Sequence, residues 1–356
     1  MASPSSPRRR AASRAPKSAS LATIAATAGV SIATVSRIVN GLPRHASAET
    51  EARVRQVIEA LGYRPNQIGR ALQQGKSRLV AMLTAELANP VMATIASVTE
   101  AALRDAGYVM ILCDTHDRPD LQDEYLHAMR ALVVEGYVLA TNVRSPGLEE
   151  FVTRGERMVF ACRPNPYAAE GTAGAFLGID NAQAGRDAAD YLLDRDCTRF
   201  AVLSQANGSP ASIARALGCC ERLRERGVPK GRIRDIRAPG HSHLAVGYAA
   251  ARALAGRRPW RGGIVCASDQ IAFGTYRFAC EHGLDLTTAN PLISIDGADL
   301  SAWLAPWLTS LHVPYEEFGT HIVEMLQTLW KGQPAADHIV PYSLRAAGAF
   351  PVDDLC

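Results

Sequence analysis

The chain has 356 residues, 47% hydrophobic and 21% charged, which is a globular composition at a length that usually forms two or three domains. No stretch approaches the roughly 18 uninterrupted apolar residues of a membrane span, which argues against a transmembrane protein. Residues 1–78 hold thirteen Lys or Arg against three acids, so the net charge of +3 conceals a basic head that favours binding to a polyanion.

The first segment, residues 1–19, is rich in Ser, Ala, Pro and Arg and is predicted to be a disordered basic tail. Because the weakly apolar segment Leu21–Val35 follows it, this start also resembles a secretory signal or a transit peptide. Thr27, Gly29 and Ser31 interrupt that segment, however, and a pair of short helices explains the interruptions better than an export signal does.

Two short helices are predicted next. Ser20 is a good N-cap for a helix over Leu21–Ala28, and Gly29 supplies the left-handed residue that a tight turn needs. Ser31 caps a second helix over Ile32–Val39, which the Asn-Gly pair at 40–41 stops. We expect Val35 and Val39 to lie on the buried side of this second helix.

A third helix is predicted to support this pair. It begins at the Ser47 cap and ends at Gly62. Its apolar side chains recur at helical spacing and are Val54, Val57, Ile58 and Leu61. Two short helices with small residues at their crossing and a supporting third form a helix-turn-helix unit.

Three segments in this region resemble the headpiece of the LacI/GalR family in their order and spacing. They are AGVSIATVSRIVNG (Ala28–Gly41), SAETEARVRQVIEALGYRPN (Ser47–Asn66) and IGRALQQGKS (Ile68–Ser77). The resemblance implies a cytoplasmic transcription regulator, by family default a repressor, that binds a pseudo-palindromic double-stranded DNA operator as a homodimer. It implies no cofactor, no metal and no membrane.

DNA contacts follow from placing the second helix in the major groove. Arg37 suits a bidentate contact to guanine, although a solvated surface arginine is the alternative, and Ile32 and Ala33 offer only apolar contact, for example to a thymine methyl. The residues that suit phosphates are Ser31, Thr34, Ser36 and Asn40. Phosphate contacts position the protein, whereas base contacts specify the sequence.

Residues 66–77 are predicted to be a hinge helix and linker. A helix over 66–74 is short enough to be marginal alone, and Gly69 weakens it further. The family resemblance implies that this segment folds only on DNA, in the minor groove, with Leu72 as the leucine wedged between central base pairs and Asn66 as a further contact. The family usually has Ala where this chain has Gly69.

From residue 78 apolar runs of four to six residues alternate with helical stretches, which predicts α/β structure with parallel sheets. The expected strands are Leu79–Thr84, Tyr108–Cys113, Tyr137–Ala140, Met158–Ala161, Phe176–Ile179, Phe200–Leu203, Ile233–Ile236, Gly263–Cys266, Leu292–Ile295 and Ser310–Val313. The expected helices are Val91–Ala106, Leu121–Val134, Ala182–Asp194, Ala211–Arg226, Leu244–Leu254, Asp269–His282 and Glu316–Trp330.

This number of strand-helix repeats is larger than one sheet usually holds. Two lobes are therefore predicted, with a ligand cleft at the carboxyl ends of their strands. The predicted fold class is an all-α helix-turn-helix headpiece followed by an α/β two-lobed periplasmic-binding-protein-like body with parallel sheets. The predicted domains are a headpiece over 20–65 and an effector-binding and dimerisation body over 78–345. Within the body one lobe spans roughly 78–178 with 314–332 and the other spans 179–312 with 333–345.

The body also resembles the family's periplasmic-binding-protein-like core, at Asn89-Pro90, at GIDN (178–181), at SDQIAFG (268–274) and in the segment 295–314. Carried over one by one, the residues that match effector-binding positions are Asn89, Arg163, Arg215, Asp269 and Asp296. Arginines and carboxylates that converge in a cleft suit sugar hydroxyls, because charge-assisted hydrogen bonds are strong and directional. Singly, Asp269 has the alternative role of a helix N-cap.

Two departures from the family bear on the effector. Val91 and Met92 stand where sugar-binding relatives often have aromatics, and Cys162 stands where an acid commonly precedes Arg163. Losing an acid beside two arginines makes the site more positive, so a sugar acid or another small anion is the first hypothesis and a neutral monosaccharide the alternative. The dimer surface is expected on the helix over Val91–Ala106 and near Tyr125–Val134, by resemblance only.

Two other classes of protein remain to be weighed. No phosphate loop, dinucleotide fingerprint, nucleophile elbow or HExxH motif is present, so an enzyme is not expected. The eight scattered cysteines are typical of reduced cytosolic thiols, and His241 and His243 are expected to be exposed rather than metal ligands. An exported sugar-binding protein is the alternative function, but it would lack the headpiece. No heptad tail follows Tyr342, which favours a dimer over a tetramer.

Overall fold

The computed structural model describes residues 20–39, 46–63, 77–168, 174–240, 242–256, 260–286 and 290–348. The chain divides into two compact units, Met1–Gly75 and Lys76–Cys356, here called the headpiece and the body and described separately. The expected basic tail and three of the DNA-contact candidates, Asn40, Asn66 and Leu72, lie outside the described residues.

The described part of the headpiece contains three helices, α1 (Leu21–Ala28), α2 (Ile32–Val39) and α3 (Ala48–Ala60). The side chains of Ser20 and Ser47 accept hydrogen bonds from backbone N–H groups in the first turns of α1 and α3. Both residues are therefore N-caps, as we predicted from the sequence. The two helices of the expected helix-turn-helix are therefore both present, with α3 packed against them.

A small apolar core holds the headpiece together, and its fully buried members include Ile24, Val35 and Val54. The expectation for α2 was partly wrong, because Ile38 is buried whereas Val39 is only partly so. Residues 38 and 39 both lie about one helical turn after Val35, and Ile38 is the one nearer the centre of the buried face. No single helix in the described part of the chain is long and apolar enough to cross a membrane, and only α1 and α2 taken together, bent by 109°, would pass on length and composition.

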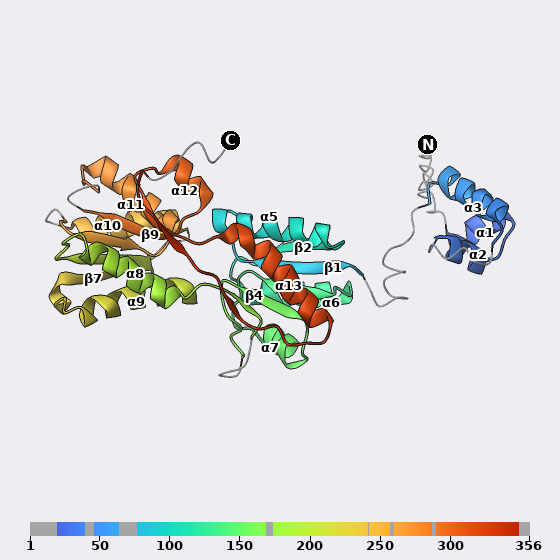
Figure 1. Ribbon diagram of the computed structural model, residues 1–356, viewed down its shortest axis with the longest axis horizontal. Helices are drawn as coiled ribbons and strands as arrows, with labels where there is room; N and C mark the ends of the chain where they lie inside the picture. Colours follow the sequence, from blue (N-terminus) through green and yellow to red (C-terminus); the bar gives the residue numbers. More distant parts are fainter. Residues whose placement is uncertain are drawn as a thin grey trace, which may run out of the picture. The chain divides into compact units, whose positions relative to one another are not determined.

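The body contains two six-stranded sheets, each covered by helices on both faces (Figure 1). The first sheet has the order β11-β5-β4-β3-β1-β2. Its strands are β1 (Leu79–Thr84), β2 (Val109–Asp114), β3 (Gly136–Leu139), β4 (Met158–Ala161), β5 (Phe176–Gly178) and β11 (His338–Ile339). All of its pairings are parallel.

The second sheet has the order β12-β10-β9-β8-β6-β7, and only its β10–β12 pair is antiparallel. Its strands are β6 (Phe200–Gln205), β7 (Ile233–Ala238), β8 (Gly263–Cys266), β9 (Leu292–Asp296), β10 (Thr309–His312) and β12 (Ser343–Arg345). In each lobe the first five strands along the chain, β1 to β5 and β6 to β10, are parallel and follow the same order, that of a doubly wound α/β sheet. The predicted two-lobed body with parallel sheets is confirmed.

Helices cover both faces of each sheet. Those of the first lobe are α5 (Pro90–Asp105), α6 (Pro119–Ala131), α7 (Pro146–Thr153) and α13 (Phe318–Trp330). Those of the second lobe are α8 (Asn181–Leu193), α9 (Pro210–Glu225), α10 (His243–Ala255), α11 (Asp269–His282) and α12 (Asp299–Leu304). Two short 3-10 turns, Lys230–Arg232 and Tyr315–Glu317, complete the list.

The core alternates along each strand, as side chains that point to opposite faces require. In β1, Val80 and Met82 belong to the cluster that α5 and α13 cover, whereas Ala81 and Leu83 pack with the residues of α6 and α7. Because both faces are covered, every residue of β1 after the first is fully buried, which is why the strand is a continuous apolar run in the sequence.

Glycines allow close approach in the helix pairs of the second lobe. A Cβ on Gly218 of α9 would lie 2.1 Å from the carbonyl oxygen of Ala182 in α8, and one on Gly185 of α8 would lie 2.0 Å from that of Arg215 in α9. Gly247 and Gly274 make the same exchange between α10 and α11. These helices therefore pack with their backbones almost in contact.

The chain crosses between the lobes after β5, after β10 and between β11 and β12. The last crossing corrects our boundary, because 333–345 was assigned to the second lobe but β11 adds to the first sheet beside β5. The carboxylate of Asp337 holds this segment there, since it accepts backbone hydrogen bonds from Gly174 and Phe176. Only β12 lies in the second sheet.

Candidate functional site

The first candidate surface is the exposed side of α2. Ser31, Ile32, Ala33 and Arg37 are exposed, and Ile32 keeps 53% of its surface accessible although it is apolar. Arg37 makes no hydrogen bond or ion pair with any described residue, and α2 holds no acid to neutralise it. An exposed apolar side chain one turn from such an arginine is a suitable surface for a base edge.

The polar candidates on α2 are less available than the sequence suggested. The hydroxyl of Ser31 accepts a hydrogen bond from the backbone N–H of Thr34 at 3.1 Å, and the two hydroxyls lie 2.9 Å apart. Thr34 and Ser36 are partly buried. These side chains therefore have a capping or packing role in the headpiece in addition to the phosphate contact we expect of them.

The second candidate site is a cavity of about 460 Å³ between the two lobes of the body. Its walls come from the segments that follow β1, β2, β3 and β4 in the first lobe and β6, β7, β8 and β9 in the second, together with the first turns of α5, α9 and α10. It thus lies at the carboxyl ends of both sheets, where doubly wound folds bind ligands.

Four of the five predicted effector-binding residues line this cavity, namely Asn89, Arg163, Arg215 and Asp296. Asn89 caps α5, because its side-chain oxygen accepts a hydrogen bond from the backbone N–H of Val91 at 3.0 Å. Its amide nitrogen has no partner among the described residues and remains a donor.

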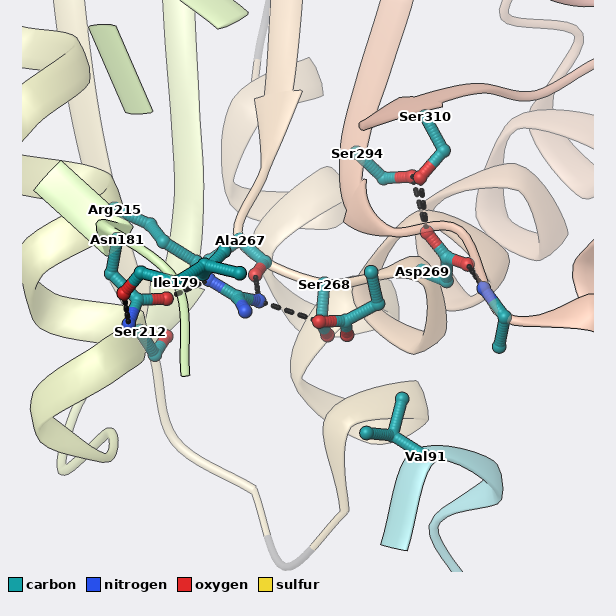
Figure 2. A network of polar contacts seen from close by, with 12 residues as sticks. Val91, Ile179, Asn181, Ser212, Arg215, Ala267, Ser268, Asp269, Ser294 and Ser310 are labelled. Atoms are coloured by element: carbon teal, nitrogen blue, oxygen red, sulfur yellow. Dashed lines mark hydrogen bonds and ion pairs between the residues drawn. The ribbon is translucent and has the colours of Figure 1, made fainter. Parts of the chain in front are cut away.

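Asp269 is the exception, because it does not line the cavity. Figure 2 shows its carboxylate turned toward Ser294 and Ser310, away from Arg215. It accepts hydrogen bonds from the hydroxyls of Ser294, Ser301 and Ser310 and from the backbone N–H of Ala298. Burial is the main cause that raises the pKa of this carboxyl.

The preceding residue, Ser268, is the member of this pair that faces the cavity. Asp269 is the first residue of α11, and the helix turns its side chain toward the strands β9 and β10 of its own lobe. The expectation that Asp269 faces a ligand is therefore wrong. In the structure this residue has a packing role inside the second lobe.

Arg215 lies at the centre of the second lobe's wall and is 8% exposed. Its Nη1 donates to Oδ1 of Asp296 at 2.8 Å and to the carbonyl oxygen of Ala267 at 2.9 Å, and its Nε donates to Asn181 at 2.8 Å (Figure 2). The side chain of Tyr315 also hydrogen-bonds to this guanidinium, so Arg215 is held on several sides.

Arg163 is paired in the same way in the first lobe. Its Nη1 and Nη2 donate to the two carboxylate oxygens of Asp117 at 2.6 and 2.9 Å, and Nη1 also donates to the carbonyl of Asn142. Sequence reasoning missed Asp117, which follows a different strand. Because each arginine has a carboxylate partner, the cavity does not carry the excess positive charge that we expected from Cys162.

Two further cavity residues were missed. The hydroxyl of Tyr315 donates to Oδ1 of Asp296 at 2.9 Å and lies at the second crossing between the lobes. His243 was expected to be exposed, but its Nδ1 lies 2.9 Å from the hydroxyl of Ser268, and burial lowers the pKa of its ring. Its neighbour His241 lies outside the described residues.

The backbone is strained where it enters this cavity. Among the described non-glycine residues, Asp296 has φ 135° and Cys162 has φ 63°, while His116 and Asp117 have φ 52° and 54°. Each such conformation costs of order 1–3 kcal/mol and persists only when the surrounding structure imposes it. Four strained residues around one cavity indicate that its shape, and not only its composition, is fixed by the fold.

Comparison with known proteins gives two matches along the chain. Residues 20–66 match the model described as bacterial regulatory proteins, lacI family. Residues 189–346 match the model described as a periplasmic binding protein-like domain. The two matched regions correspond to the headpiece and to most of the second lobe with the last two crossings.

Regulators from several bacteria are similar over most of their length. The HTH-type transcriptional regulator PtxS of Pseudomonas putida is 29% identical over 88% of this chain and 90% of its own. An uncharacterized HTH-type transcriptional regulator in the aml 5' region of Streptomyces limosus is 30% identical, with 86% of each chain covered. The ribose operon repressor of Halalkalibacterium halodurans is 27% identical over 85% of this chain and 88% of its own.

Solved structures share the fold. The lac repressor dimer bound to operator and the anti-inducer ONPF superposes with a TM-score of 0.78 at 20% identity, covering 94% of this chain and 100% of the other. A LacI family transcriptional regulator from Enterococcus faecium with bound ribose superposes with a TM-score of 0.64 at 21% identity, covering 75% and 96%.

Proposed function

Because this chain belongs to the LacI family of bacterial regulatory proteins and is a DNA-binding transcription regulator rather than an enzyme, we propose that a sugar bound between the lobes controls its affinity for DNA. The helix-turn-helix headpiece argues against the exported sugar-binding protein that was the alternative. The observation that carries the proposal is the cavity of about 460 Å³ at the carboxyl ends of both sheets, with Arg163 and Arg215 in its walls.

The donors left in this cavity suit hydroxyl groups. Among the described residues, Arg163 keeps its Nε without a partner and Asn89 keeps its amide nitrogen. Asp296 and Asp117 provide acceptors beside the two arginines. The family members that match this chain include a ribose operon repressor, and one structural relative holds ribose, which supports a ligand of this class.

A sugar acid, our first hypothesis from the sequence, is disfavoured by the charges. Three carboxylates, those of Glu86, Asp117 and Asp296, line the cavity beside two arginines. A carboxylate on the ligand would add to an existing negative excess, because both arginines of the cavity already hold a carboxylate partner.

On the DNA side, the proposed complex is a cytoplasmic homodimer on a pseudo-palindromic operator, with one α2 in each of two major-groove half-sites. Arg37 and Ile32 are the proposed base contacts. Repression is the proposed direction of control, as the ribose operon repressor is named for it.

Two sets of exposed apolar side chains support a dimer of the body. One is on the edge strand β2, where Val109 and Leu112 are exposed. The other is α12, where Trp303 and Leu304 keep 59% and 67% of their surface accessible. Apolar side chains gathered in this way mark interaction surfaces. Both sets lie outside the regions that we named from the sequence, which were Val91–Ala106 and Tyr125–Val134.

The test is binding of the purified full-length protein to fragments of its own upstream DNA at two salt concentrations, with and without a panel of sugars and sugar acids. We expect tight binding to one fragment and a change in affinity with a sugar. Weak binding that is equal on all fragments and vanishes with salt would contradict sequence-specific regulation. Release by sugar acids alone would contradict the proposed effector class.

A further inference from the structure

Glu86 is a cavity carboxylate with no cationic partner. It follows β1 at the carboxyl edge of the first sheet, is half-buried, and lines the cavity. Its side chain makes no hydrogen bond or ion pair with any described residue, whereas Asp117 pairs with Arg163 and Asp296 with Arg215. Of the three cavity carboxylates, Glu86 alone therefore lacks a charge to balance it.

The rest of the cavity supplies no such charge. The two arginines are already paired, at 2.6 Å in the first lobe and 2.8 Å in the second. His243 lines the opposite wall, and although the charge of Glu86 raises the pKa of its ring, burial is the larger effect and lowers it. With histidines counted as neutral, the titratable side chains of the lining carry one more negative than positive charge.

Two donors without partners lie in the same cavity. Arg163 keeps its Nε and Asn89 its amide nitrogen without a partner among the described residues. The hydroxyls of Thr141 and Ser212 also lack partners, but both oxygens are buried and closed to a ligand. Asn89 and Arg163 are therefore the places for ligand hydroxyls.

We propose that the effector is an amino sugar, whose hydroxyls bind the free donors of Asn89 and Arg163 and whose protonated amine binds the carboxylate of Glu86. This inference rests on the proposed function and names the chemical class of its ligand. A neutral sugar can donate a hydroxyl hydrogen bond to Glu86, but it leaves the negative charge of the cavity unbalanced. A sugar acid would place two like charges in one cavity, whereas an ammonium group both neutralises the carboxylate and donates charge-assisted hydrogen bonds to it.

The experiment is calorimetric titration of the full-length protein at pH 7 with matched sets of ligands. Each set contains an amino sugar, its parent sugar with a hydroxyl in place of the amine, and the corresponding sugar acid, beginning with glucosamine, glucose and gluconate and continuing with the galactose and mannose series. We expect one amino sugar to bind about tenfold or more tightly than its parent, and the acid of that series to bind most weakly.

The variant Glu86→Gln removes the charge but keeps the size of the side chain. The ratio of the affinities for the amino sugar and its parent is expected to fall about tenfold in this variant. Glu124→Gln, which removes an exposed acid from α6 of the same lobe, is the control and should leave that ratio unchanged. Thermal unfolding of both variants shows that each is folded.

Three results separate the two proposals. If a parent sugar binds as tightly as its amine, or if Glu86→Gln changes both affinities equally, the amino-sugar inference is overturned while the sugar-controlled regulator stands. If no ligand of any series binds, the sugar-binding function fails, and the inference with it. Tightest binding of an acid would overturn the inference and restore the sugar-acid hypothesis.

Discussion

Arg37 is the residue on which sequence recognition is predicted to depend. It is exposed on α2, and no described acid competes for its guanidinium. We expect Arg37→Ala to cost about 1–3 kcal/mol of operator binding and to relax the preference at one base pair, because a bidentate contact to guanine is lost. Quantitative binding to operators substituted one base pair at a time measures both effects.

Arg37→Lys is the matched variant, since it keeps the charge but not the planar fork. It should retain binding to random DNA and lose the preference for the one base pair. Equal losses on the operator and on random DNA in Arg37→Ala would instead make this arginine a phosphate contact.

Asp269 leads to a prediction about the pH dependence of stability. Burial and then Asp296 raise the pKa of its carboxyl above the ordinary value of 3.8. The folded chain therefore holds this proton more tightly than the unfolded chain does. The stability that the protonated group contributes is present below the unfolded pKa and is lost as the pH rises through the raised folded pKa.

Asp269→Asn, which does not ionise, is accordingly expected to lose less stability than the wild type as the pH rises from about 4 through the raised folded pKa. Urea unfolding midpoints of both proteins across this range measure the difference. Two curves that stay parallel would mean that the proton at Asp269 is not coupled to folding.

The residues of the site were only partly predictable from the chain. Asn89, Arg163, Arg215 and Asp296 were carried over from the family's effector-binding positions, and all four line one cavity. Asp117 was missed because its role depends on pairing with an arginine that follows another strand. No local pattern indicates such a partnership, and the same holds for Tyr315, which reaches Asp296 from a crossing between the lobes.

At the scale of helices and strands, the close contact of α8 with α9 yields a prediction. A Cβ at Gly218 would lie 2.1 Å from the backbone oxygen of Ala182, so Gly218→Ala must push the two helices apart. We expect it to destabilise the protein by about 1–3 kcal/mol and to weaken sugar binding, because Arg215 lies one turn away on α9. Unfolding curves and ligand titration check the two effects.

Gly231→Ala is the control, since no atom lies within 4 Å of the added Cβ. It should leave both stability and ligand affinity near those of the wild type. If Gly218→Ala behaved like this control, the two backbones would have to be farther apart than the structure has them.

A second prediction at this scale concerns α12. If its exposed apolar side chains lie in the dimer surface, Leu304→Glu should shift the protein toward monomer, because a charge would be buried there without a partner. Light scattering across a range of concentrations measures the shift. Leu217→Glu, at another exposed leucine of the second lobe, should leave the mass unchanged, and a persistent dimer in Leu304→Glu would contradict the proposed surface.

The elements themselves were largely predictable. β1, β4, β8 and α11 match the expected ranges residue for residue, because buried parallel strands are continuous apolar runs and long helices are periodic. The sequence did not reveal β11 or β12, which hold two and three residues and whose side chains are mostly exposed. For such short segments, pairing with a neighbouring strand decides the structure, and local pattern does not.

For the whole molecule, the proposed coupling between cavity and headpiece makes a reciprocal prediction. Whatever factor the sugar applies to operator affinity, the operator must apply to sugar affinity, since the two describe one thermodynamic cycle. Titrating the sugar in the absence and in the presence of saturating operator measures that factor. A sugar that binds the body but changes neither affinity would mean that the cavity does not regulate DNA binding.

The arrangement of the cavity also bears on how such a regulator diversifies. Most of its walls belong to loops that follow eight different strands, while most of the apolar core lies under the helices on both faces of each sheet. A substitution at one loop therefore alters the small molecule that is recognised and leaves the core packing intact. The fold can thus be kept while the recognised small molecule changes. A duplicated gene can acquire a new effector through a few codon changes in these loops.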